Sequence, residues 1–159
     1  ETSGQAILTG LQQVQAYPHR YSVSAVAGPQ ASVRVSAQGL PIILSAPPRE
    51  FDGPGDQWSP ESLLVASVAD CFVLTFRAIS RPAKLEWRNL ECQVEGVLER
   101  VDGITQFSGF STRATLTLPP GADKAKAQLL LEKAERGCLI ANSLRGTRSL
   151  TADIQVDPA

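Results

Sequence analysis

The first part of the chain contains three short apolar stretches separated by turn residues. Residues 21–27 alternate apolar and polar positions with the period of a strand, and Gly28-Pro29 then predicts a turn. Two further apolar stretches follow at residues 33–35 and 42–44, on either side of Gly39. This pattern predicts an antiparallel meander of three strands.

A long apolar stretch after Ser59 predicts a buried helix. Ser59 is a suitable N-cap, a proline follows at the first helical position, and Glu61 is favoured at the positive end of the helix dipole. Apolar side chains then occupy nearly every face until Arg81-Pro82, over about 21 residues, which gives a rod of roughly 30 Å. A membrane span fits this length, but Asp70 and Arg77 interrupt the stretch. We therefore expect the central helix of a soluble domain and no membrane partner.

The next region is typical of a long β-hairpin. Residues 85–98 alternate as a strand, with a change of face near Arg88-Asn89 that predicts a β-bulge. Asp102-Gly103 predicts a hairpin turn, and the returning strand covers residues 107–118.

Two helices and a last strand complete the pattern. Residues 122–136 have helical spacing, and Gly137 is a natural C-terminal cap. Cys138 follows directly, and residues 139–144 predict a short helix that begins there. Alternation over residues 150–156 predicts the final strand.

These elements divide the chain into an extension and one domain. Residues 1–20 form an N-terminal extension, in which residues 5–16 predict a short helix that Pro18 ends. Residues 21–159 form a single α+β domain with the order βββ, α, ββ, α, α, β, and its length and apolar content suffice for a substantial core.

Charge and composition narrow the range of partners. The chain has 15 Lys+Arg against 16 Asp+Glu with no block of like charge, so we expect no nucleic-acid partner and a small, neutral or mildly charged substrate. The N-terminus shows no basic-then-apolar signal pattern, which predicts a cytoplasmic protein.

The three cysteines do not form a metal or disulfide framework. No Cys-x-x-Cys pair exists and the only histidine is His19, so we expect no metal and no cofactor. Cys92 shares the strand pattern of Leu90 and Val94, which favours a structural role. Cys71 taken alone is typical of a small core residue in an apolar helix.

Two motifs change the interpretation of the other two cysteines. Pro60-Glu61-Ser62-Leu63 followed by Cys71 resembles the first signature of the osmotically inducible and organic hydroperoxide resistance (OsmC/Ohr) family. Glu135-Arg136-Gly137-Cys138 with the following Asn142-Ser143 is similar to its second cysteine motif, at the separation expected for the family. The resemblance covers residues 21–156.

The resemblance implies both a fold and a chemistry. The fold is an intertwined homodimer, in which antiparallel β-sheets wrap around long central helices and active sites lie at the subunit interface. The chemistry is reduction of organic hydroperoxides, with Cys71 as the attacking thiol, Cys138 as the resolving thiol, and a dithiol reductant, of lipoyl type in the simplest case. Glu61 would hold the arginine that activates Cys71.

The sequence offers two candidates for that arginine. Arg49 stands in a context, residues 49–53, that resembles one branch of the family with one inserted residue. Arg34 is the reserve, because the loop between the first two strands, where another branch has its arginine, contains none here. As ordinary residues, Arg49 would be a solvated loop side chain and Glu61 a favourable helix N-terminal acid.

The chemistry requires an ionised thiol. A thiol with a pKa near 8.5 is only about 3% ionised at pH 7, and lowering the pKa by ~2 units makes it about three-quarters thiolate. One partly buried guanidinium can supply this stabilisation. Phe72, Leu74 and Phe76 flank Cys71, and the loop at residues 47–60 can shape an entrance, so we expect an apolar pocket that prefers bulky organic hydroperoxides.

Two other functional classes remain open from the sequence. A binding or redox-sensing module on the same fold uses the same thiols without turnover, and a purely structural dimeric domain uses neither. Turnover with a dithiol reductant separates the enzyme from both.

Overall fold

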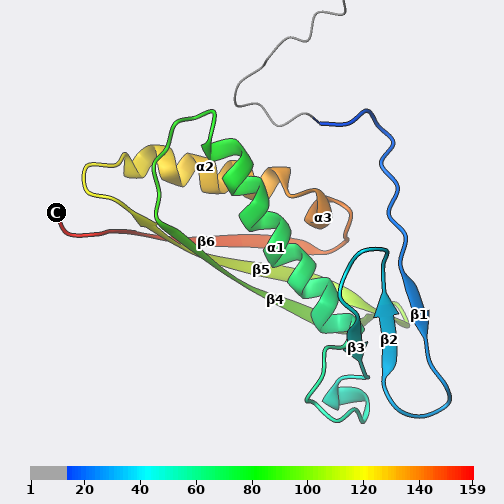
Figure 1. Cartoon of the computed structure of the whole chain (residues 1–159). Helices are drawn as coiled ribbons and strands as arrows, with labels where there is room; N and C mark the ends of the chain where they lie inside the picture. Colours follow the sequence, from blue (N-terminus) through cyan, green and yellow to red (C-terminus); the bar gives the residue numbers. More distant parts are fainter. Residues whose placement is uncertain (1–13) are drawn as a thin grey trace, which may run out of the picture. The chain divides into compact units, whose positions relative to one another are not determined.

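The computed structural model describes residues 14–159, which fall into two compact units with a boundary after Ser45. Figure 1 shows the helices and strands of each unit. The helix predicted over residues 5–16 lies mostly outside the described residues, and residues 14–16 have no regular secondary structure.

The N-terminal unit contains the predicted meander. Its strands β1 (Ser24–Val26), β2 (Val33–Ser36) and β3 (Ile43–Ser45) pair antiparallel in the order β1-β2-β3. The three strands lie where the sequence places them, although β1 is shorter than the alternating stretch.

The second unit begins with a loop and the long helix α1 (Pro60–Ser80). The loop is closed at its base by a hydrogen bond from the Ala46 N–H to the Trp58 carbonyl, 2.9 Å, and contains a 3₁₀ turn, Arg49–Phe51. Ser59 caps α1 as predicted, because its hydroxyl accepts from the Ser62 N–H at 3.1 Å while the Ser59 N–H donates to the Ser62 hydroxyl at 2.9 Å. The helix therefore begins and ends within one residue of the prediction.

The second unit also contains a three-stranded sheet. It has the order β4-β5-β6, with β4 (Asn89–Val101) antiparallel and β6 (Thr147–Val156) parallel to the central β5 (Ile104–Leu118). Asp102 and Gly103 form the predicted hairpin turn, with φ of 52° and 78°.

The predicted bulge was in the wrong place. The register between β4 and β5 shifts between Val97 and Leu98, whereas Arg88 and Asn89 mark the start of the strand. Residues 85 and 87 belong to the link between α1 and β4. The change in which side chains are apolar near Arg88 therefore marks the end of this link and the start of β4, and it is not a bulge within a strand.

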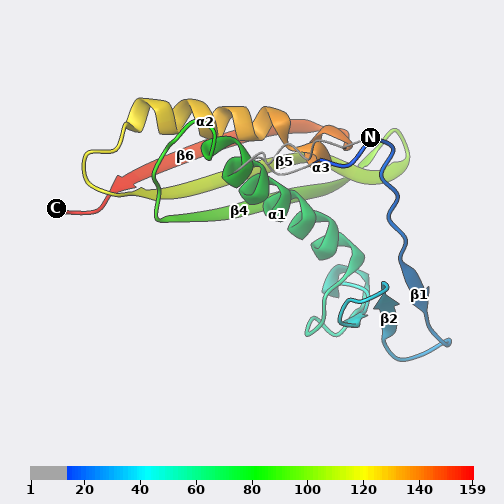
Figure 2. The same ribbon diagram turned by 45° about the horizontal axis from the view of Figure 1, so that its top comes forward.

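Helices α2 (Lys124–Gly137) and α3 (Leu139–Asn142) connect β5 to β6. The prediction of Gly137 as a C-terminal cap was wrong: Gly137 is the last helical residue, and Cys138 is the cap with an extended φ and ψ of −66° and 103°. Figure 2 shows α1 and α2 against the sheet, and both contribute to one core with the inward side chains of β5. That core includes Phe72, Phe76, Leu116, Leu131 and Ala134, all nearly inaccessible to solvent.

Candidate active site

Cys71 lies in the middle of α1 and is half-buried. Its Sγ is 3.8 Å from the Oγ1 of Thr75, one turn further along the helix, a distance typical of a weak thiol–hydroxyl hydrogen bond. The side chain packs against a buried cluster formed by Val68, Phe110, Cys138 and Ala141. Cys71 therefore contacts buried side chains on one side, while part of its own side chain remains accessible to solvent.

Cys138 occupies the turn between α2 and α3 and is only 1% exposed. Its thiol donates to the carbonyl oxygen of Val68 on α1 at 3.9 Å. The preceding Gly137 lies against Thr75, since a Cβ built on it would be 3.6 Å from the Thr75 Cγ2. Val68 and Thr75 stand on either side of Cys71 along the helix, so the Cys138 turn packs on the part of α1 that carries Cys71.

The two thiols influence each other. Burial raises the pKa of the Cys138 thiol to about 11, and the neighbouring Cys71 thiol adds to the rise, while backbone N–H groups of α3 oppose it. Both cysteines are free thiols in this structure. Cys138 is thus a buried thiol next to Cys71, and its raised pKa keeps it protonated near neutral pH.

Cys92 lies on β4 and packs against the core of α1, α2 and β5. Burial raises the pKa of this thiol to about 12, and the nearby Glu135 carboxylate and Cys138 raise it further. A thiol in such surroundings is a poor nucleophile at neutral pH, which agrees with the structural role expected from its strand pattern.

Glu61 sits in the first turn of α1 beside a cavity of about 500 Å³. Its Oε2 is buried and has no hydrogen-bond partner in the described part of the chain. A buried carboxylate oxygen normally accepts from a donor, because leaving it unpaired is costly. The atom is therefore suited to receive a guanidinium N–H or another donor.

The two candidate arginines are placed differently. Arg49 belongs to the 3₁₀ turn and is exposed, and its side chain lies across Gly55, where a Cβ would be 1.9 Å from the Arg49 Nε. Within the described residues no hydrogen bond or ion pair joins Arg49 to Glu61 or Cys71. Arg34 lies on β2 in the N-terminal unit.

Apolar side chains from the loop, α1 and the hairpin share the lining of the cavity with Glu50, Glu61 and Glu95, and Cys71 does not line it. The loop contributes as expected, through Pro48 and Phe51. Phe72 and Phe76, which flank Cys71 along the helix, do not line this cavity, because both rings are 1% exposed or less and belong to the core. The other apolar lining residues are Val65, Val94, Leu98 and Phe107.

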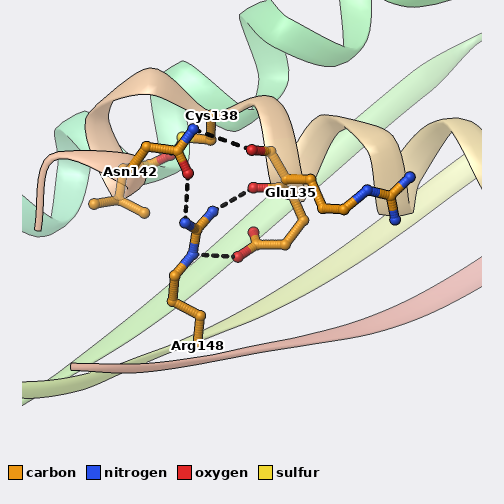
Figure 3. Close-up of polar contacts among 6 residues, drawn as sticks. Glu135, Cys138, Asn142 and Arg148 are labelled. Carbon is orange, nitrogen blue, oxygen red and sulfur yellow. Dashed lines mark hydrogen bonds and ion pairs between the residues drawn. The ribbon is translucent and has the colours of Figure 1, made fainter. Parts of the chain in front are cut away.

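A polar cluster around Cys138 includes one residue that the sequence reasoning missed (Figure 3). The guanidinium of Arg148 on β6 donates to the Glu135 carboxylate at 2.8 Å, to the Glu135 carbonyl oxygen, and to the Asn142 side-chain oxygen at 2.6 Å. Glu135 and Asn142 belong to the second cysteine motif. Nothing in the sequence marks Arg148 as a functional residue, because it is a polar residue at an ordinary polar position of an alternating strand.

No group of three metal-binding side chains occurs among residues 14–159. The structure brings Cys71 and Cys138 together. It does not bring Glu61 to them: Glu61 lies ten residues before Cys71, about 15 Å along α1, and the cavity beside it is lined by neither cysteine. Thiol chemistry is the reaction class that two adjacent cysteines can perform.

Comparison with known proteins identifies the family to which the chain belongs. A family model described as OsmC-like protein matches residues 53–153. Uncharacterized protein YmaD of Bacillus subtilis is 30% identical over 112 residues, which are 69% of this chain and 75% of that protein. An organic hydroperoxide resistance protein of Xanthomonas axonopodis pv. citri is 33% identical over 131 residues, covering 80% of this chain and 88% of the relative.

Solved structures match the fold. An OsmC-like protein of unknown function from Vibrio cholerae aligns with a TM-score of 0.78 at 15% identity, over 85% of this chain and 99% of that one. An organic hydroperoxide resistance protein from Legionella pneumophila aligns with a TM-score of 0.69 at 24% identity, over 88% and 99% of the two chains. The α+β fold class predicted from the sequence is thereby confirmed.

Proposed function

Because the chain belongs to the OsmC-like protein family, we propose that it is a thiol-dependent peroxidase that reduces organic hydroperoxides with Cys71 and Cys138. The observation that carries the proposal is the packing of the Cys138 turn on the stretch of α1 between Val68 and Thr75, which brings a buried thiol to the half-buried Cys71. The relatives named for organic hydroperoxide resistance support the substrate class.

The proposed reaction has two steps on the enzyme. The Cys71 thiolate attacks the terminal oxygen of R–O–OH, so that an S–O bond forms, the O–O bond breaks, and the alkoxide leaves and takes a proton as the alcohol. Cys138 then attacks the sulfenic acid on Cys71: the S–S bond forms, the S–O bond breaks, and hydroxide leaves with the Cys138 proton as water. A dithiol of lipoyl type returns both thiols by exchange and is itself oxidised to a disulfide.

Activation of Cys71 is assigned to an arginine held by Glu61. The buried Oε2 of Glu61 supports this role, because a guanidinium donor would satisfy it. Glu61 precedes Cys71 by ten residues, about 15 Å along α1, so the arginine must extend from Glu61 towards the thiolate. Arg49 is the proposed residue and Arg34 the alternative. Among the described residues of the second unit Arg49 is not paired with Glu61, so the arrangement depends on a movement of the loop or on a second copy of the chain.

We assign the enzyme to a homodimer. Helix α1 has the length and apolar composition of a membrane span, yet only 17% of its most apolar window is buried within the chain. Asp70 and Arg77 in α1 oppose membrane insertion, whereas a second subunit can cover an apolar helix and pair these charges. A cytoplasmic location is proposed together with this assembly, because free thiols persist in reducing compartments.

The apolar cavity beside Glu61 supports a preference for organic hydroperoxides. Its lining of loop, helix and strand side chains favours a bulky apolar group over hydrogen peroxide, which buries no apolar surface. Gly96 keeps the cavity wall compact, since a Cβ there would be 2.8 Å from the Val65 Cγ2.

Steady-state consumption of peroxide tests the function. We expect turnover of cumene hydroperoxide with dihydrolipoamide, little turnover with a monothiol such as glutathione, and a lower kcat/KM for hydrogen peroxide than for cumene hydroperoxide. Cys71→Ser is expected to abolish turnover, because a serine hydroxyl is hardly ionised near neutral pH. Equal efficiency with hydrogen peroxide would argue against the apolar cavity as the substrate site.

A redox-sensing module on the same fold is the second candidate. It is favoured by the position of Arg49, which is not paired with Glu61 or Cys71 in this chain. Oxidation of Cys71 by one equivalent of peroxide without continued turnover under dihydrolipoamide would select this function.

A further inference from the structure

Arg148 forms hydrogen bonds to both helices that flank Cys138, α2 and α3. Its Nε donates to the Glu135 carboxylate at 2.8 Å and a second guanidinium nitrogen donates to the Glu135 carbonyl oxygen, both in the last turn of α2. Its Nη1 donates to the Oδ1 of Asn142, the last residue of α3, at 2.6 Å. One planar side chain therefore bridges residues three before and four after Cys138 (Figure 3).

The cluster is closed by a further contact. The side-chain amide of Asn142 donates to the Arg136 carbonyl at 3.0 Å, and its backbone N–H donates to the Cys138 carbonyl at 2.9 Å. The turn is thus held by Arg148 from the sheet side and by Asn142 from within. Because α3 has only four residues, its own hydrogen bonds alone cannot fix the turn firmly.

The position of Arg148 is itself well defined. It is the second residue of β6 and is paired in register with Phe110 on β5, whose ring is buried in the same cluster as Cys138. Its side chain is 25% exposed and that of Glu135 17%, so solvent screens their ion pair less than a pair on the surface. The bond geometry matches the charge-assisted contacts that guanidinium groups make with carboxylates and amides.

The resolving step requires such control of geometry. For a disulfide the two Cα atoms must approach within roughly 7 Å, and the thiol must reach the sulfur of the sulfenic acid. If the Cys138 turn fluctuated away from α1, the sulfenic acid on Cys71 would persist and a second peroxide could oxidise it to the sulfinic acid.

From this geometry we propose that Arg148 is a positioning residue of the resolving step, which holds the α2–α3 turn against α1 so that Cys138 reaches the oxidised Cys71. The proposal rests on the proposed peroxidase function, since it concerns the second of its two steps. It assigns Arg148 no contact with the peroxide and no part in the attack by Cys71.

Single-turnover oxidation with cumene hydroperoxide separates the two steps. We expect Arg148→Lys, which keeps the charge but cannot bridge both helices, to form sulfenic acid at the wild-type rate and the Cys71–Cys138 disulfide about tenfold more slowly. Excess peroxide should then convert Cys71 to the sulfinic acid in the variant and not in the wild type. Asn142→Ala should slow disulfide formation in the same direction, and it provides a second variant should a substitution at Arg148 prevent folding.

A matched variant serves as the control. Arg88→Ala breaks the exposed ion pair, 2.6 Å, between Arg88, just before β4, and Asp157, just after β6, and it should change neither step.

Each outcome has one meaning. Disulfide formation at the wild-type rate in both Arg148→Lys and Asn142→Ala overturns the positioning role, as does an equal slowing of both steps. If the wild-type protein forms neither sulfenic acid nor disulfide, the proposed peroxidase function itself fails, and with it the role of Arg148.

Discussion

The three cysteines have the same chemistry but different surroundings, and the surroundings decide what each thiol can do. Cys138 and Cys92 are kept protonated by burial, whereas Cys71 is half-buried beside the hydroxyl of Thr75. The two sequence motifs were sufficient to single out Cys71 and Cys138. They could not single out Arg148, because its partners come from other elements and depend on how β6 pairs.

The raised pKa values predict a loss of stability at alkaline pH. The thiols of Cys92 and Cys138 have folded pKa values of about 12 and about 11, above the ordinary 9.0, so the folded state keeps their protons after the unfolded state has released them. Their contribution is therefore complete below pH 9 and falls as the pH rises towards 11 and 12.

Urea denaturation of the reduced protein between pH 7 and pH 10.5 measures this effect. We expect Cys92→Ala to lower the free energy of unfolding at pH 7 through lost packing, and to make its decline above pH 9 less steep than in the wild type. Parallel pH profiles for the two proteins would show that Cys92 does not titrate in this range on unfolding.

At the scale of the elements, the periodicity of apolar residues predicted the order of helices and strands along the chain better than it predicted how the strands pair. The capped helix α1, the Asp102-Gly103 turn and the final strand followed from local chemistry. The bulge was misplaced because the packed link before β4 also alternates. The parallel pairing of β6 with β5 was not predictable, since alternation shows which side chains face inward but not the direction of the neighbouring strand.

The start of β6 depends on a glycine. Gly146 has a φ of 102°, and a Cβ there would be 2.5 Å from the Ser108 carbonyl oxygen. Gly103, with a φ of 78° and open space around it, provides a matched control. We expect Gly103→Ala to cost about 1 kcal/mol of conformational strain, and Gly146→Ala to cost more, because it adds a backbone clash.

Chemical denaturation of the two variants tests this difference. Since Gly146 precedes Arg148 by two residues, Gly146→Ala should also slow formation of the Cys71–Cys138 disulfide, which Gly103→Ala should leave unchanged. Equal stability of both variants would mean that the chain can shift at Gly146 without cost.

At the scale of the whole molecule, several large apolar side chains of the single chain are exposed. Leu74 on α1 is 47% exposed, and Val26 in the N-terminal unit is 65% exposed. The apolar faces of α1 predicted a fully buried helix, yet the isolated chain buries only part of it. The proposed homodimer accounts for this difference, because a second copy of the chain would cover the exposed face of α1.

Sedimentation velocity at micromolar concentration tests the proposed homodimer. We expect a single species of twice the chain mass that unfolds without a folded monomer, because separation would expose α1 and the N-terminal strands. Asp70→Leu on α1 is a useful comparison, since it removes a charge from the expected interface. A folded monomer that retains peroxidase activity would contradict the assembly.

The central claim is that Cys71 attacks the peroxide and Cys138 resolves the product. The most direct measurement is mass spectrometry of peptides from wild-type protein and Cys138→Ser after treatment with one equivalent of cumene hydroperoxide. The account predicts a Cys71–Cys138 disulfide in the wild type and a trappable sulfenic acid on Cys71 in the variant, with Cys92 unmodified in both. Oxidation of Cys92 or Cys138 with Cys71 still a free thiol would contradict it.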